Sequence, residues 1–138
     1  MKIYFAGSIR GGREDQELYL EFIKILSNFG TVLTEHIGDK SLSNVGETIV
    51  SDSYIYERDM QWVRESDVVV AEVSTPSLGV GYEIGQAQSM NKSVLCLRRT
   101  TAEKKLSAML VGNAYIKVAE YSTINDVADI LRKFLNTI

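Results

Sequence analysis

The stretch DVVVAEVSTPSLGVGYEIG, residues 67–85, contains the features that decide the fold: an apolar run, a turn and the start of a helix. Residues 67–73 are rich in β-branched side chains and predict a buried strand. Pro76 and Gly79 mark a turn, and residues 80–90 follow it with a helical pattern. The stretch therefore predicts a strand, a short loop and a helix in succession, which is the unit from which parallel sheets are built.

Strand and helix patterns alternate along the rest of the chain. Further strands are predicted at residues 2–6, 31–34, 93–97 and 114–118, and further helices at 14–29, 54–66, 106–111 and 124–135. Residues 38–53 are polar and are interpreted as a long loop, which makes them a lid candidate. We expect one domain over residues 1–138, with an α/β, Rossmann-like (flavodoxin-like) three-layer fold and a five-stranded parallel sheet in the order 2-1-3-4-5. In that order a ligand crevice lies between strands one and three, at their carboxyl ends.

The composition argues against several classes of protein. With 138 residues, the chain is large enough to bury a core without a disulfide or a metal. A net charge of −3 argues against a large nucleic-acid or membrane surface. No signal peptide or membrane span is visible, so we expect a cytoplasmic protein, or a nuclear one if the source is eukaryotic. Cys96 lies in an apolar run and is expected to be a buried thiol, and a single histidine leaves no visible metal site.

Glu83 is the first candidate catalytic residue. The pattern places it in the first turn of the predicted helix, where free N–H groups and the helix dipole favour negative charge. We therefore expect Glu83 to be ionised at neutral pH. A fixed carboxylate can attack an electrophilic carbon or stabilise a cation that forms beside it. Glu is also common in first helical turns for the dipole alone, so its position does not by itself establish chemistry.

Asp59 and Tyr4 are predicted to share the crevice with Glu83. If residues 54–66 are helical, Asp59 falls within the apolar arc of that helix. A carboxylate there is either hydrogen-bonded structurally or faces a cavity, where desolvation raises its pKa. One ionised and one perturbed carboxylate together suit the cleavage of a glycosidic bond through a cationic transition state. Tyr4, near the end of the first strand, is placed to supply a hydroxyl, although strand packing is the alternative.

The segment GSIRGG, residues 7–12, lies between the first strand and the first helix. Its glycines let the backbone approach a ligand, and the helix that follows presents free N–H groups. Ser8 adds a hydroxyl and Arg10 a guanidinium that suits phosphate oxygens. The segment matches neither GxGxxG nor the P-loop, which disfavours a dinucleotide or triphosphate. It is interpreted as a monophosphate site, with a Gly-rich turn and a solvated Arg as the alternative.

Three further features have less specific interpretations. His36 follows the second strand and is placed to face the crevice, although a surface histidine is the alternative. Gly81 and Gly85 lie one helical turn apart and permit close packing, either within the chain or in a dimer. A basic cluster near the end of the fourth strand is interpreted as a solvated face, and it comprises Arg98, Arg99, Lys104 and Lys105.

Several motifs, taken in order, resemble one known family. They are GSIRGGRED, VLTEH, ERDMQW, DVVVAEV, PSLGVGYEIG and LSAML, and together with the flanking elements they span nearly the whole chain. This pattern is similar to that of the 2′-deoxynucleoside 5′-phosphate N-hydrolases, within the nucleoside 2-deoxyribosyltransferase superfamily. The resemblance implies hydrolysis of the N-glycosidic bond of a deoxynucleoside monophosphate, which gives a free base and 2-deoxyribose 5-phosphate. The sequence departs from the family mainly in the loop 38–53.

The resemblance also implies a role for individual residues. Glu83 corresponds to the nucleophile that attacks C1′, Asp59 to the acid/base partner near the departing base, and Tyr4 to the residue that holds the sugar and Glu83 in register. The positions implied to bind substrate are Ser8, Ile9, Arg10, Gly11, Gly12, His36, Ser77, Gly79, Ser107 and Met109. Ser107 matches a serine that reaches the phosphate of the neighbouring subunit, so a homodimer with shared sites is implied. The resemblance implies neither a metal nor another cofactor.

Two alternative functions stay open on the sequence alone. A nucleoside 2-deoxyribosyltransferase would use the same glutamate but would pass the sugar to a second base rather than to water. Arg10 in an anion site argues for a 5′-phosphate, whereas these transferases act on free nucleosides. A nucleotide-binding sensor without turnover would keep the fold, but it would have no need for Glu83, Asp59 and Tyr4 together.

Overall fold

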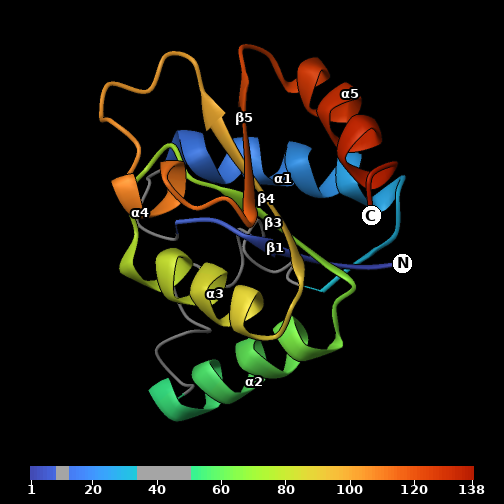
Figure 1. Cartoon of the computed structure of the whole chain (residues 1–138), viewed down its shortest axis with the longest axis vertical. Helices are drawn as coiled ribbons and strands as arrows, with labels where there is room; N and C mark the ends of the chain where they lie inside the picture. The colour runs from blue at the N-terminus through green and yellow to red at the C-terminus, as the bar shows by residue number, and fades with distance from the viewer. Residues whose placement is uncertain (9–12, 34–50) are drawn as a thin grey trace.

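Strands and helices alternate along the chain in the computed structural model, which describes residues 1–8, 13–33 and 51–138 (Figure 1). The elements in chain order are β1 (Lys2–Ala6), α1 (Arg13–Ser27), β2 (Thr31–Val32), α2 (Asp52–Glu65), β3 (Val68–Glu72), α3 (Leu78–Ser89), β4 (Ser93–Arg99), α4 (Ala108–Val111), β5 (Ile116–Tyr121) and α5 (Ile124–Leu135). All strand pairs are parallel, and the strands form one sheet in the order β2-β1-β3-β4-β5. The α/β fold and the predicted strand order are therefore confirmed.

The helices cover both faces of the sheet and make three layers (Figure 1). Because side chains alternate along a strand, Phe5 and Val70 point to the face that α1 and α5 cover, while Tyr4 and Ala71 point to the face that α2 and α3 cover. Each face carries its own buried apolar cluster. This alternation decides which residues at the carboxyl ends of the strands can meet. Tyr4 packs against α2 and α3. Glu72 lies two residues after Val70 in the same strand, so it points to the face that α1 and α5 cover.

The predicted elements are present, but two helices begin earlier than the apolar pattern indicates. Ser77 caps α3, because its hydroxyl accepts a hydrogen bond from the Val80 N–H at 3.4 Å, and the helix begins at Leu78. Ser51 caps α2 in the same way through the Tyr54 N–H at 3.3 Å. Glu83 consequently lies in the second turn of α3 and not in the first, where it was predicted.

Other expectations about the fold have mixed outcomes. Cys96 is fully buried in β4, as predicted, and burial raises the pKa of its thiol to about 12. Most of the predicted loop 38–53 lies outside the described residues, which resume at Ser51. Among the helices that the structure describes, none is long and apolar enough to cross a bilayer. No group of three metal-binding side chains gathers within the same described ranges.

Candidate functional site

The three predicted catalytic side chains come together on the face of the sheet that α2 and α3 cover. Tyr4 projects from β1, Asp59 comes from the middle of α2, and Glu83 comes from the second turn of α3. Tyr4 and Glu83 share a side-chain hydrogen bond. A cavity of about 300 Å³ opens between the two helices, and its lining comprises Asp52, Ile55, Tyr56, Asp59, Met60, Gly79, Tyr82 and Glu83.

Glu83 has an unusual pKa for a carboxyl group. Burial, followed by the nearby charge of Asp59, raises the pKa of Glu83 to about 8, while the hydrogen bond from Tyr4 acts in the opposite direction. At pH 7 about a tenth of such a group is ionised. The prediction that Glu83 is ionised at neutral pH is therefore wrong for this structure. The second turn of α3 lies beyond the free N–H groups at the helix start, so the dipole does not compensate for the desolvation.

Tyr4 is a fixed neutral donor to this carboxyl group. Its side chain is 1% exposed, at the centre of the sheet. Burial, and then the charges of Glu83 and Asp59, keep the pKa of Tyr4 far above its usual range. The phenol therefore keeps its proton and donates it in the hydrogen bond to Glu83.

The sequence left two environments open for Asp59, a structural hydrogen bond or a position facing a cavity, and in the structure Asp59 has both. It lines the cavity beside Glu83, and its carboxylate also accepts a hydrogen bond from Nε of Arg58 at 2.9 Å. The Asp59 side chain is 19% exposed. Arg58 is itself held in place, because its guanidinium lies 4.9 Å from the ring centroid of Trp62. Asp59 is thus a supported carboxylate that faces the same space as Glu83.

The predicted phosphate-binding residues are only partly described. Ser8 follows β1 and is 3% exposed, and Ser77 lies at the start of α3. Both segments lie at the carboxyl edge of the sheet, where β1 and β3 are neighbours. Ile9, Arg10, Gly11 and Gly12 lie outside the described residues, and so does His36. Their roles stay predictions.

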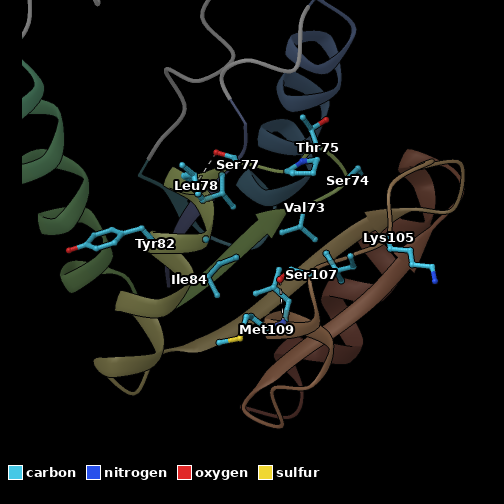
Figure 2. A pocket seen from close by; sticks show the side chains of 15 residues that line it. Val73, Ser74, Thr75, Ser77, Leu78, Tyr82, Ile84, Lys105, Ser107 and Met109 are labelled. Carbon is cyan, nitrogen blue, oxygen red and sulfur yellow. Dashed lines mark hydrogen bonds between the residues drawn. The ribbon is translucent and has the colours of Figure 1, made fainter.

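A second and larger cavity, of about 550 Å³, lies on the other side of α3 (Figure 2). Figure 2 shows Ser77 and Leu78 on one side of this space and Ser107 and Met109 on the other, while Tyr82 points away toward α2. Leu78 is 97% exposed and Met109 is 81% exposed. Within one chain, therefore, the structure does not bring Ser107 and Met109 to the cavity that holds Glu83.

Comparisons with known proteins identify the family. The sequence model described as nucleoside 2-deoxyribosyltransferase matches residues 3–121. The chain belongs to the nucleoside 2-deoxyribosyltransferase family. It is 48% identical to the 5-hydroxymethyl-dUMP N-hydrolase of Danio rerio over 141 residues, which cover 100% of this chain and 98% of the relative. It is 56% identical to the protein of the same name from Tetraodon nigroviridis over 113 residues, 81% of this chain and 80% of the relative.

The fold of this family member also matches solved structures. The solution structure of BlsM covers 98% of the chain, and the chain covers 91% of BlsM, with a TM-score of 0.75 at 20% sequence identity. The structure of the CMP N-glycosidase BcmB from Clostridium botulinum matches with a TM-score of 0.67 at 18% identity, covering 97% of this chain and 99% of that one. These likenesses support the α/β fold and its strand order.

Two tyrosines of this nucleoside 2-deoxyribosyltransferase family member were not predicted as site residues. Tyr56 and Tyr82 both line the cavity that holds Glu83, and their hydroxyls lie 3.4 Å apart across the gap between α2 and α3. Tyr56 is 49% exposed. The sequence contained two signals that could have identified these tyrosines as site residues. Tyr56 lies one helical turn before Asp59, and Tyr82 directly precedes Glu83.

Proposed function

We propose that this protein hydrolyses the N-glycosidic bond of 2′-deoxynucleoside 5′-monophosphates, which releases a free base and 2-deoxyribose 5-phosphate. The observation that carries the proposal is the cavity that Glu83 and Asp59 both line, together with the hydrogen bond between Glu83 and the buried Tyr4. Two carboxyl groups and a neutral hydroxyl in one partly desolvated space suit glycosidic cleavage. The names of the relatives from Danio rerio and Tetraodon nigroviridis support a deoxynucleoside monophosphate as the substrate class.

Glu83 is the nucleophile in the proposed reaction. One oxygen of its carboxylate attacks C1′ of the sugar, while the bond between C1′ and the base nitrogen breaks and its electron pair leaves with the base. Before this step the proton held by Glu83 passes to Asp59, which then donates it to the departing base. The product of this step is a glycosyl ester on Glu83, which water then attacks at C1′. Asp59 accepts the proton of that water, and Glu83 is released as a carboxylate.

The electrostatics of the cavity support this assignment. A carboxylate whose pKa is about 8 is a stronger base, and therefore a stronger nucleophile, than an ordinary carboxylate. Its charge is poorly solvated before the reaction. Positive charge develops at C1′ as the base departs, and it stabilises the Glu83 carboxylate more in the transition state than in the ground state. Such a difference lowers the barrier to the reaction.

In this proposal, binding of the 5′-phosphate positions C1′ of the sugar beside Glu83. Ser8 after β1 and Ser77 before α3 are the described residues that we assign to the phosphate, together with residues 9–12. A phosphate held at the carboxyl edge of the sheet anchors the end of the sugar opposite to the bond that breaks. The binding energy of this remote group then orients C1′ against Glu83. Free nucleosides lack the phosphate and should be poor substrates.

We also propose that the protein acts as a homodimer through α3 and α4. The residues on and beside these helices include several exposed large apolar side chains, namely Leu78, Met109, Val111 and Tyr115, and Leu78 and Met109 line the same cavity. Gly81 on α3 has no atom within 4 Å of the position of an added Cβ, so the helix surface is open to close approach. In this arrangement Ser107 and Met109 of one copy complete the phosphate site of the other.

A product assay tests the proposed activity. The purified protein is incubated with each deoxynucleoside monophosphate, including 5-hydroxymethyl-dUMP, with the matching free nucleosides and with the ribonucleotides, and the released base is separated by chromatography. We expect base release from the deoxynucleoside monophosphates, its loss in Glu83→Gln and its retention in Glu57→Gln, an exposed position on α2. Exchange of bases between free nucleosides would instead indicate a transferase. Nucleotide binding without base release would indicate a sensor.

A further inference from the structure

A polar cluster lies on the opposite face of the sheet from Glu83, at the same carboxyl edge. Glu72 at the end of β3 is fully buried, and Asp15 in the first turn of α1 is 4% exposed. Arg99 at the end of β4 lies 2.9 Å from Asp15 and 3.7 Å from Glu72. The sequence placed Arg99 on a solvated basic face, and this prediction is wrong. β4 continues through Arg99 and turns its side chain into the layer that α1 and α5 form.

Asp15 connects α1 to two segments that are distant in sequence. One of its carboxylate oxygens pairs with the Arg99 guanidinium at 2.9 Å, and the other accepts a hydrogen bond from the Thr75 hydroxyl at 3.0 Å. An acidic residue that serves only the helix dipole would face solvent. Asp15 is buried instead, and both of its oxygens are used by the loop after β3 and by the end of β4. Asp15 therefore connects α1 to the segment that leads into α3.

The start of that segment is held from a second direction. The Ser74 hydroxyl donates a short hydrogen bond to Glu72 and accepts one from the Arg99 N–H at 2.7 Å. The Tyr121 hydroxyl donates to the same Glu72 carboxylate at 2.9 Å. Burial raises the pKa of Glu72, while these hydrogen bonds act against that rise. Thus Ser74 is hydrogen-bonded to β3 and β4, and Glu72 connects it to Tyr121 of β5, while Thr75 next to it is hydrogen-bonded to α1.

The segment after β1 also rests on α1. A Cβ at Gly7 would lie 2.9 Å from the ring of Tyr19, so the backbone of Gly7 packs directly against that side chain. Ser8 follows immediately and is buried. The two segments that lead to Ser8 and to Ser77 therefore both contact α1, one through Tyr19 and the other through Asp15. Figure 2 shows Thr75 and Ser77 on successive parts of the second segment.

We infer that Asp15 is a positioning residue for the phosphate of the substrate. By holding Thr75 and Arg99 against the first turn of α1, it sets the separation between the segment that carries Ser8 and the segment that carries Ser77. The inference rests on the proposed function, because these segments are the ones assigned there to the phosphate. Asp15 does not touch the substrate. Its effect is to keep the two halves of the phosphate site at a fixed spacing, and preorganised binding groups lose less free energy when a ligand binds.

Binding of 2-deoxyribose 5-phosphate and of inorganic phosphate, measured by calorimetry on the full chain, tests this role. Asp15→Asn keeps the size of the side chain but loses the ion pair with Arg99, and Thr75→Val loses the hydrogen bond to Asp15 and keeps the shape. We expect each variant to weaken binding of both ligands by about ten-fold and to raise KM for a deoxynucleoside monophosphate by a similar factor, with kcat within about two-fold. Asp129→Asn removes an exposed acid that pairs with Arg132 on α5 and should change neither quantity.

The possible results separate the inference from the proposed function. A residue with a purely structural role would lower the melting temperature without separating KM from kcat. Should the unaltered protein bind 2-deoxyribose 5-phosphate while Asp15→Asn and Thr75→Val bind it as tightly, the inference is overturned and the proposed function stands. Should the unaltered protein bind neither ligand and release no base, both are overturned. If Asp15→Asn does not fold, Thr75→Val decides the question, because it removes a single hydroxyl from a half-buried position.

Discussion

Glu83 and Asp59 face one cavity from two helices, and after burial the charge of Asp59 is the second cause that raises the pKa of Glu83 to about 8. The pair connects the fold to the proposed chemistry, because α2 and α3 pack side by side on the same face of the sheet. Their separate positions in the sequence give no indication of this coupling. The coupling can be measured as a shift in the pH at which kcat/KM changes.

The pH dependence of kcat/KM should follow the ionisation of Glu83. Attack at C1′ requires the Glu83 carboxylate, and the departing base requires a proton on Asp59, so the pair must hold one proton. We therefore expect kcat/KM to fall about ten-fold per pH unit above pH 8. Rates measured between pH 5.5 and 9.5 in buffers of constant ionic strength test this expectation. The second ionisation of the substrate phosphate falls near pH 6 and produces a separate inflection. A profile that is flat from pH 6.5 to 9 would contradict the role of Glu83.

Asp59→Asn should replace this fall with a rise in kcat/KM whose midpoint lies below pH 8, because the variant has no acid to deprotonate and needs only the Glu83 carboxylate. The substitution removes the charge of Asp59 and with it one cause of the raised pKa of Glu83. The rate on the plateau should fall about 100-fold, because the variant lacks the group that protonates the departing base. Asp52→Asn is the matched control, since Asp52 lines the same cavity but is not among the causes of the shift. Equal changes in the two variants would contradict the specific coupling between Asp59 and Glu83.

Tyr4→Phe, which retains Asp59, should shift the fall in kcat/KM to higher pH. Its hydroxyl lowers the pKa of Glu83 by a hydrogen bond, so its removal raises that pKa further. One such bond to a charged group corresponds to about one pH unit. The phenylalanine ring fills the same space in the sheet, and the free energy of unfolding should therefore change little. The measurement is the midpoint of the pH profile, and a shift to lower pH would show that Tyr4 does not donate to Glu83.

Much of the fold could be predicted because its determinants are local. The apolar run of β3 and the turn after it indicate a parallel unit, and a parallel sheet with crossover helices restricts the strand order. The start of α3 was misplaced because the prediction followed the apolar period, although Ser77 carried the capping signal. That shift of two residues moved Glu83 out of the first turn. The prediction about its charge was wrong for another reason, because burial and the charge of Asp59 raise the pKa of Glu83.

The candidate site was predictable in its residue types and not in its electrostatics. Glu83, Asp59 and Tyr4 were selected by motif and by helical phase, both of which are local. The pKa of Glu83 depends on burial and on a charge from another helix, which no local pattern contains. Arg99 shows the same limit, because its surroundings in the sequence are basic and polar, whereas its partners Asp15 and Glu72 come from other elements. Packing between distant segments decides both properties.

Glu83→Gln should stabilise the protein at alkaline pH. The pKa of Glu83 is raised from 4.5 to about 8 on folding, so the folded protein holds a proton that the unfolded chain releases. The resulting contribution to the free energy of unfolding is complete below pH 4.5 and is lost as the pH rises through 8. The advantage of Gln over Glu should therefore grow between pH 5 and 9, by an amount on the order of 4 kcal/mol. Urea unfolding of both proteins at pH 5 and pH 9 measures this difference in the free energy of unfolding. Glu57→Gln, at an exposed position, is the control and should show no increase in its advantage between the two pH values.

Gly81→Leu should dissociate the proposed dimer without harming the folded subunit. The position of an added Cβ at Gly81 has no atom within 4 Å, and leucine exceeds glycine in helix propensity by about 0.8 kcal/mol, so the subunit itself should gain stability. Against a second copy of α3, however, the larger side chain prevents close approach. Sedimentation should then show a monomer, with activity reduced because Ser107 of the neighbouring copy is absent. Asp129→Leu adds the same side chain to an exposed position on α5 and should stay dimeric. A Gly81→Leu variant that sediments as a dimer and keeps its activity would show that α3 is not the interface.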